Sequence, residues 1–249
     1  MDRQYVFISD VHLGSKFCDT ILLGEFLASL NERPTTLCLT GDIFDFWKMQ
    51  EIKFSFKDYL PRNTNLIYLP GNHDAEFNVL KTLTKCSDLP LTSGVQTSYM
   101  FELPGIDLLA THGHIFDEDY GDPYNIYFRL KDLFFYLISS VLGIELRETW
   151  IATKLFPLVF NKTKFFENAA KFAKRNNIDV IVLGHSHICG EIETSLPVKV
   201  ISLGNWTSKL KSPTALFVRG NEYVLHEIKP GDIYPEENCF KDFRPDQDL

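Results

Sequence analysis

Five of the seven histidines in this 249-residue chain follow short apolar runs, together with carboxylate and amide side chains. In chain order the motifs are Asp10-Val11-His12, Gly41-Asp42, Gly71-Asn72-His73-Asp74, His112 and Gly184-His185-Ser186-His187. Carboxylate, imidazole and amide oxygen suit borderline-hard ions such as Mn²⁺, Fe²⁺ or Zn²⁺. None of these motifs contains a cysteine, which argues against a purely structural zinc site. The set therefore predicts a metal centre with seven candidate ligands and one further histidine.

Strand-like segments must position these motifs. Apolar and β-branched runs lead directly into them at residues 5–8, 37–40, 66–69, 108–111 and 180–183. In α/β sheets the carboxyl ends of the strands form the edge at which several loops build one site. We therefore expect the five motifs to meet at one sheet edge.

Other segments complete the predicted elements. Residues 20–31 carry apolar side chains at helical spacing. After His187 the pattern indicates strands over 198–203, 214–218 and 223–228. The polar and acidic tail from Pro230 predicts no regular element.

The overall composition excludes several classes of protein. Hydrophobic residues make up 45% of the chain and charged residues 23%, as in soluble globular proteins, which excludes disorder, collagen and a coiled coil. With 25 Lys and Arg against 33 Asp and Glu the net charge is −8, so no nucleic-acid partner is expected. Five cysteines without C-x-x-C spacing fit a reducing compartment. Since the start lacks a signal-peptide core, we expect a cytoplasmic protein.

Residues 124–176 differ from the rest of the chain. They carry nine basic residues against four acidic ones, and their first half is apolar nearly all round. Its uncharged apolar run, 133–144, has 12 residues, which is short of the about 18–20 needed to span a bilayer. One interpretation of the segment is a buried core helix. The other, favoured by basic residues beside aromatic ones, is a cap that holds lipid chains or lies on a membrane surface.

From Tyr5 to about Ile228 the ordered motifs resemble the calcineurin-like metallophosphoesterases. The resemblance implies an α/β fold: a single domain over 1–249, a two-sheet β-sandwich flanked by helices, with a helical cap insertion at about 124–176. It also implies two divalent ions, with Mn²⁺ favoured and Fe²⁺ or Zn²⁺ as alternatives. Carried over by position, one ion would be held by Asp10, His12, Asp42 and His187, and the other by Asp42, Asn72, His112 and His185. His73 matches the family's non-ligand histidine, the catalytic group that gives a proton or hydrogen bond to the leaving group or a phosphoryl oxygen.

Some neighbouring residues carry two interpretations. Asp74 either orients His73 or caps a helix. His114 competes with His112 for one ligand position, and we favour His112 because it directly follows the strand. Asp45 is interpreted as structural rather than as a ligand.

Three segments, at residues 9–14, 41–47 and 203–206, resemble the UDP-2,3-diacylglucosamine pyrophosphatase branch of that family. The resemblance implies a hydrolase that cleaves this lipid-linked nucleotide sugar to UMP and 2,3-diacylglucosamine 1-phosphate in lipid A synthesis. It also implies a peripheral position on the inner membrane through residues 124–176. In that branch an arginine often stands at the position of His73.

A substrate with two acyl chains and a diphosphate needs an apolar cleft beside cationic groups. The segment offers apolar candidates for that cleft at Phe134, Phe135, Leu137, Phe156, Phe160, Phe165 and Phe166. It offers cationic candidates at Arg129, Arg147, Lys154, Lys162 and Lys164.

Two other functions stay open. The first is a phosphodiesterase or phosphatase that acts on a soluble nucleotide or phosphoester, in which case the aromatic segment is ordinary core. The second is a non-catalytic scaffold, which is disfavoured because all seven ligand positions are filled. The sequence indicates no protein partner.

Overall fold

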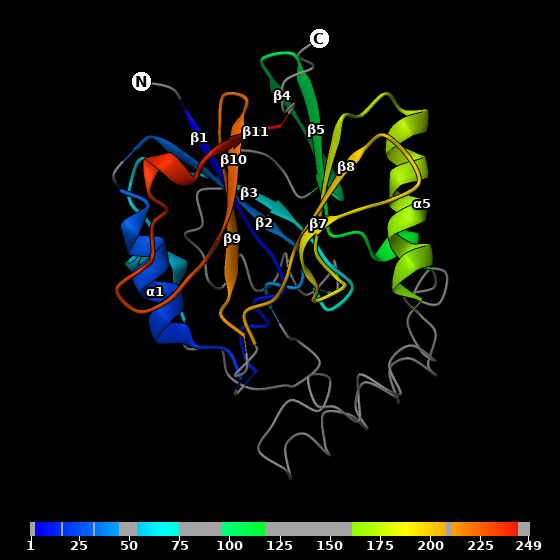
Figure 1. Ribbon diagram of the computed structural model, residues 1–249. Helices are drawn as coiled ribbons and strands as arrows, with labels where there is room; N and C mark the ends of the chain where they lie inside the picture. Colours follow the sequence, from blue (N-terminus) through cyan, green and yellow to red (C-terminus); the bar gives the residue numbers. More distant parts are fainter. Residues whose placement is uncertain are drawn as a thin grey trace.

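The computed structural model describes residues 3–15, 17–31, 33–44, 54–74, 96–117, 161–207 and 211–243. Two β-sheets pack face to face, with one helix on the outer face of each (Figure 1). This arrangement confirms the predicted two-sheet sandwich of the α/β class.

The first sheet has six strands. In spatial order they are β11 (Lys241–Asp242), β10 (Glu222–Glu227), β9 (Thr214–Arg219), β1 (Gln4–Ile8), β2 (Thr35–Thr40) and β3 (Asn65–Leu69). β1, β2 and β3 are parallel, with Val6 beside Leu37 and Leu37 beside Leu66. Their carboxyl ends therefore lie at one edge of the sheet.

The second sheet has five strands. In spatial order they are β4 (Ser98–Leu103), β5 (Ile106–Thr111), β6 (Val180–Leu183), β8 (Lys199–Leu203) and β7 (Cys189–Ile192). The central strands β5, β6 and β8 are parallel, while β4 and β7 run antiparallel at the two edges. The motifs at His112 and Gly184 follow the ends of β5 and β6.

Strands buried on both faces explain the continuous apolar runs in the sequence. Along β1, the side chains of Val6 and Ile8 pack toward α1 (Thr20–Ser29), whereas Phe7 points into the layer between the sheets. The Asp19 carboxylate caps α1 by accepting hydrogen bonds from the backbone N–H groups of Ile21 and Leu22. Fully burying one such apolar side chain contributes roughly 1.5–3 kcal/mol to the free energy of folding. Apolar clusters beneath α1, between the two sheets and beneath the helix on the second sheet therefore hold the strand ends firmly in position.

The helix α5 (Lys162–Arg175) covers the second sheet (Figure 1). Phe165 and Phe166 are 1% and 4% exposed and pack with Ile181 and Val200 of the sheet. The prediction that these two phenylalanines line an acyl-chain cleft is therefore wrong, because their rings fill the core beneath α5. Lys162 lies on the exposed side of the helix.

Lys164 is likewise exposed on this helix, and the remaining candidates for the cap fall outside the described residues, which resume at residue 161. Within the described part of the chain, no helix combines the length and apolarity that crossing a bilayer requires.

The chain after Pro230 adds elements that the sequence analysis did not predict. It forms a short 3₁₀ helix, η6 (Glu237–Cys239), and the edge strand β11 beside β10. Other short 3₁₀ helices are η2 (Phe56–Asp58) and η3 (His114–Phe116). Of these, η3 follows the His112 motif and bears on the site.

Candidate metal centre

Three of the five motifs leave their strands in an unusual backbone conformation. Five residues have φ between 50° and 64°: Asp10, His12, Asp42, His185 and His187. Among the described residues, Asn177 is the one other non-glycine residue with positive φ. Left-handed backbone is uncommon for residues with a Cβ, and such strain gathers at functional sites when surrounding structure holds it in place. The strain therefore marks five of the candidate site residues, although Asn72, His73 and His112 do not share it.

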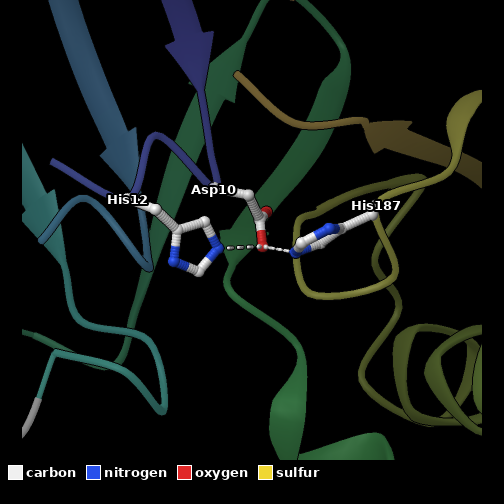
Figure 2. Close-up of side chains that lie close together, drawn as sticks. All are labelled: Asp10, His12 and His187. Atoms are coloured by element: carbon white, nitrogen blue, oxygen red, sulfur yellow. Dashed lines mark ion pairs between the residues drawn. The ribbon is translucent and has the colours of Figure 1, made fainter. Parts of the chain in front are cut away.

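The first group of donors lies at the end of β1 and in the loop after β6. Figure 2 shows the Asp10 carboxylate between the rings of His12 and His187. Asp10 Oδ1 is 3.2 Å from His187 Nε2 and 3.9 Å from His12 Nε2. Asp10 Oδ2 accepts hydrogen bonds from the Ser9 hydroxyl at 2.5 Å and the His185 backbone N–H at 3.0 Å. Asp10 Oδ2 is therefore held in place by hydrogen bonds, while Oδ1 faces the two imidazoles.

The second group of donors joins both sheets. Asp42 Oδ2 lies 3.3 Å from His112 Nε2. Asn72 Oδ1 is 3.1 Å from His112 Nε2 and 3.0 Å from His185 Nδ1. His112 Nδ1 lies 3.1 Å from the carbonyl oxygen of Thr40. Because a carbonyl only accepts, Nδ1 carries the proton and Nε2 faces the carboxylate and the amide.

The buried charges shift the pKa values of these groups. Burial alone would raise the pKa of Asp42, but the neighbouring imidazoles, led by His112, hold it well below its ordinary value. The same balance, in which the nearby His187 imidazole outweighs burial, lowers the pKa of Asp10. Burial would lower the pKa of His112, yet the Asp42 carboxylate raises it to about 9. The two carboxylates are thus anionic and draw positive charge toward them.

Two glycines make this close approach possible. A Cβ built on Gly71 would overlap Asp42 Oδ1, and one built on Gly184 would overlap the Ser9 hydroxyl and Asp10 Oδ2. Only a residue without a side chain lets the backbone come this near to the carboxylates.

His73 lies beside the donors. Its Nε2 is 4.0 Å from Asp42 Oδ2, and its ring meets that of His12 edge to face at 4.9 Å. The His73 backbone N–H donates to Asp42 Oδ1 at 2.8 Å. The loop that carries His73 is thereby fixed to the Asp42 carboxylate.

Asp74 ties two loops together. Its carboxylate accepts hydrogen bonds from the backbone N–H groups of Ile43, Phe44 and Gly71 at 3.2, 2.8 and 3.1 Å. Burial, together with the charge of Asp42, raises the pKa of Asp74 to about 6. Asp74 therefore joins the loop after β2 to the loop after β3, a role different from the two proposed from sequence.

Three groups of potential ligands lie with their donor atoms within 4.8 Å of one another. They are Asp10–His12–His187, His12–Asp42–His73 and Asp10–Asp42–His112. This Asp/His cluster is compatible with a dinuclear divalent metal site. His114 belongs to none of the three groups; its ring is 5.6 Å from that of His112, and burial lowers its pKa to about 3. Asp45 lies outside the described residues.

Sequence reasoning missed two contributors to the site. The backbone N–H of Trp206 donates to the Asp10 carbonyl at 3.0 Å, so the loop after β8 supports the loop after β1. Asp117 Oδ2 lies 3.1 Å from His185 Nε2. An acidic residue shortly after the His112 motif was the signal available in the sequence, but its partner stands 68 positions away.

Comparison with known proteins places this geometry in a family. No curated protein matches the chain. Entamoeba histolytica Vps29 in complex with Zn²⁺ has a similar fold, with 14% identity, coverage of 97% of this chain and 99% of that chain, and a TM-score of 0.50. An archaeal phosphodiesterase gives 19% identity, coverage of 90% and 99%, and a TM-score of 0.48. A predicted phosphoesterase of Streptococcus pneumoniae gives 12%, 93% and 95%, and 0.44.

At these identities the structural likeness shows the fold alone. The sequence match shows the family as well as the fold, because residues 4–189 fit the family described as Calcineurin-like phosphoesterase. That span is well over half of the chain and contains all the motifs of the centre. The protein therefore belongs to the calcineurin-like phosphoesterases, a family of metal-dependent hydrolases.

Proposed function

We propose that this protein hydrolyses phosphoesters with two divalent metal ions at the strand-edge centre. One observation carries the proposal: buried carboxylates and imidazoles from both sheets converge at one end of the sandwich, and five of these residues have left-handed backbone. The charges of the two buried carboxylates repel each other, and the strained backbone is unfavourable for folding by itself; both features fit a site that binds cations.

The donor set fits the ions in number and in chemistry. Asp10 Oδ1 is buried and accepts no hydrogen bond from the described part of the chain. Burial lowers the pKa of His185, which keeps its imidazole in the neutral form that binds metals. Asp10, His12, Asp42 and His187 would hold one ion, and Asp42, Asn72, His112 and His185 the other. Mn²⁺ is the favoured ion for this mixed oxygen and nitrogen set, with Fe²⁺ or Zn²⁺ as alternatives.

When bound, such a pair of ions supplies Lewis acidity toward a phosphoryl group and a nucleophile at neutral pH. The residues of the chain supply position and protons. Asp42 lies between the two donor groups, with Oδ2 facing the imidazoles of His112 and His73, and its carboxylate would serve both ions. His73 reaches the same space through Nε2, where it would donate a proton to the oxygen of the leaving group.

The substrate that we propose is UDP-2,3-diacylglucosamine, cleaved at its diphosphate to UMP and 2,3-diacylglucosamine 1-phosphate. Two of the branch-like segments, 9–14 and 203–206, support this proposal because they join through the hydrogen bond from Trp206 to Asp10. The basic and aromatic composition of residues 124–160 suits a lipid-linked anionic substrate. On this proposal the protein acts in the cytoplasm at the surface of the inner membrane.

A soluble phosphodiester is the second candidate. The burial of Phe165 and Phe166 favours it, because part of the segment assigned to lipid binding is ordinary core. His73 favours it as well, since this residue follows the pattern of the wider family rather than that of the lipid branch.

One experiment tests both. Purified protein with Mn²⁺ and mild detergent is given UDP-2,3-diacylglucosamine or bis-p-nitrophenyl phosphate, with His187→Ala as the control. Release of UMP that the control lacks would support the lipid substrate. Cleavage of the soluble diester alone would keep the hydrolase and reject the lipid, and no cleavage of either would reject the hydrolase proposal.

A further inference from the structure

We propose that Asp117 is a positioning residue that fixes the imidazole of His185 with Nδ1 directed into the metal centre. This inference rests on the proposed metal-dependent function, and it concerns a residue that the family motifs do not include. Asp117 follows η3, and its carboxylate lies on the side of the His185 ring away from Asn72.

The contact is short and sheltered. Asp117 Oδ2 is 3.1 Å from His185 Nε2, and the two side chains are 5% and 7% exposed. An ionised carboxylate can only accept, so Nε2 is the nitrogen that carries the proton. The lone pair of the neutral ring is then on Nδ1, the atom that lies 3.0 Å from Asn72 Oδ1.

The same arrangement occurs on the opposite side of Asn72. There the Thr40 carbonyl holds Nδ1 of His112, so that Nε2 of this ring points to Asn72 Oδ1 at 3.1 Å. Two rings are thus oriented by acceptors behind them, and both direct a nitrogen at the same amide oxygen. This convergence suits a shared cation, and Asp117 does for His185 what the Thr40 carbonyl does for His112.

Asp117 is itself held by η3, which is supported in turn by the helix α5. Its backbone N–H donates to the His114 carbonyl at 3.2 Å, which closes η3. The Asn168 amide on α5 donates to the Phe116 carbonyl at 3.2 Å. The ring of Phe165, also on α5, lies 5.6 Å from the ring of His185. The helix therefore supports both members of the pair, which limits their freedom to separate.

The test measures Mn²⁺ binding to the full-length metal-free protein by calorimetry, in the wild type, Asp117→Ala, Asp117→Asn, His185→Ala and the double variant Asp117→Ala/His185→Ala. We expect Asp117→Ala to weaken one of two binding events about 10–100-fold without changing their number. Asp117→Asn should recover most of the affinity, because its amide oxygen still accepts from Nε2–H. In the His185→Ala background, Asp117→Ala should have no further effect, since the ring on which it acts is gone.

A matched control uses a described His–Asp pair that lies outside the metal centre. His226 Nε2 lies 3.3 Å from Asp232 Oδ1, on an exposed part of β10 and its loop, and Asp232→Ala should leave Mn²⁺ binding unchanged. Circular dichroism and Tm establish that each variant folds. An equal loss of affinity in the presence and absence of His185 would overturn the inference, as would loss of one whole binding event in Asp117→Ala.

A second readout needs no metal. In the metal-free wild type we expect a slowly exchanging, downfield Nε2–H proton signal from His185 by NMR, assigned by its loss in His185→Ala. The signal should disappear in Asp117→Ala and persist in Asp232→Ala; persistence in Asp117→Ala would overturn the inference. If the wild type bound no Mn²⁺, the proposed function would fail, and this signal would still decide whether Asp117 holds His185.

Discussion

At the end of the sandwich where β1, β6 and β8 begin, charged groups lie against opposite charges and aromatic rings. Lys199 Nζ donates to the Tyr223 hydroxyl at 3.0 Å, and Lys241 pairs with Glu191. The Tyr223 ring stacks on Phe243 at 4.3 Å. At the other end, where β1, β2, β5 and β6 finish, Asp10 and Asp42 are buried among imidazoles on left-handed backbone. The first end is satisfied within the chain, whereas the second gathers negative charge and nitrogen lone pairs that suit an external cation.

This difference teaches that buried charge has two uses in one fold. The paired end joins β7 and β8 of one sheet to β10 and β11 of the other, so it closes the sandwich near the C-terminal strand. The metal end joins the same two sheets through residues that serve chemistry. Variants at each end should therefore change different properties, and the expected effects fall in the following order.

Asp42→Ala should give the largest effect. It removes the carboxylate that both donor groups share, so turnover should fall by more than about 10³-fold and metal binding should be lost. Phosphoesterase assays with Mn²⁺ titration by calorimetry check this. Activity retained with added metal would show that Asp42 is not shared between the ions.

His73→Ala should follow, with turnover lowered about 10²–10⁴-fold while both ions still bind. The reason is that His73 supplies a proton rather than a ligand. Parallel metal analysis of His73→Ala and Asp42→Ala separates the two roles. Equal metal loss in both variants would assign His73 to the ligands.

How much of the metal centre could be predicted from the sequence depends on how far apart along the chain the contacting residues lie. Asp10, Asp42 and Asn72 follow recognisable strands, so their common edge was predictable from chain-local pattern. The tie that Asp74 makes to Ile43 and Phe44 was not, because only the fold brings those backbone groups within reach of it.

The same limit applies to the rest of the fold. The predicted helix over 20–31 is confirmed as α1, because its apolar spacing is a local property. The strand β11 depends on pairing with β10, and its two residues carry no apolar pattern of their own. The assignment of Phe165 and Phe166 failed because composition does not reveal which surface an aromatic side chain covers.

Gly184→Ala should have an intermediate effect on stability and a strong one on metal affinity. The added Cβ overlaps Ser9 and Asp10, so the loop must shift, at a cost of about 1–3 kcal/mol in the free energy of unfolding. Urea unfolding and Mn²⁺ titration measure the two effects. A control that separates overlap from backbone strain is Gly105→Ala, where φ is +70° and a Cβ meets nothing within 4 Å, so metal affinity should stay unchanged.

Phe243→Leu tests the paired end. Loss of the stacked ring against Tyr223 should lower the free energy of unfolding by about 0.5–1.5 kcal/mol and leave kcat unchanged. Thermal unfolding and the phosphoesterase assay check both statements. A fall in kcat comparable with that of His73→Ala would mean that the two ends are coupled.

Glu191 should give the smallest effect, seen as a dependence of stability on pH. Although burial acts to raise its pKa, the bond with Lys241 lowers it from the ordinary value of 4.5. Because the pKa is lower in the folded protein than in the unfolded chain, the ionised Glu191 stabilises the fold at pH values above 4.5. This stabilisation is lost as the pH falls through the pKa of the folded state. Since the group is largely solvated, the loss should be under about 1 kcal/mol. Urea unfolding measured from pH 6 to pH 3 should show that the free energy of unfolding of Glu191→Gln depends less on pH than that of the wild type. Identical pH dependence in the two proteins would contradict the pairing of Glu191 with Lys241.

The left-handed backbone at the strand ends also means that stability and activity favour different residues at the same positions. Glycine would adopt the same turns at a conformational energy lower by about 1 kcal/mol per position. A search for heat-resistant variants that scored folding alone would therefore drift toward glycine at positions 10, 12, 42, 185 and 187. Such variants would keep the sandwich and lose its reactive edge, so heat resistance and turnover must be selected together in this protein.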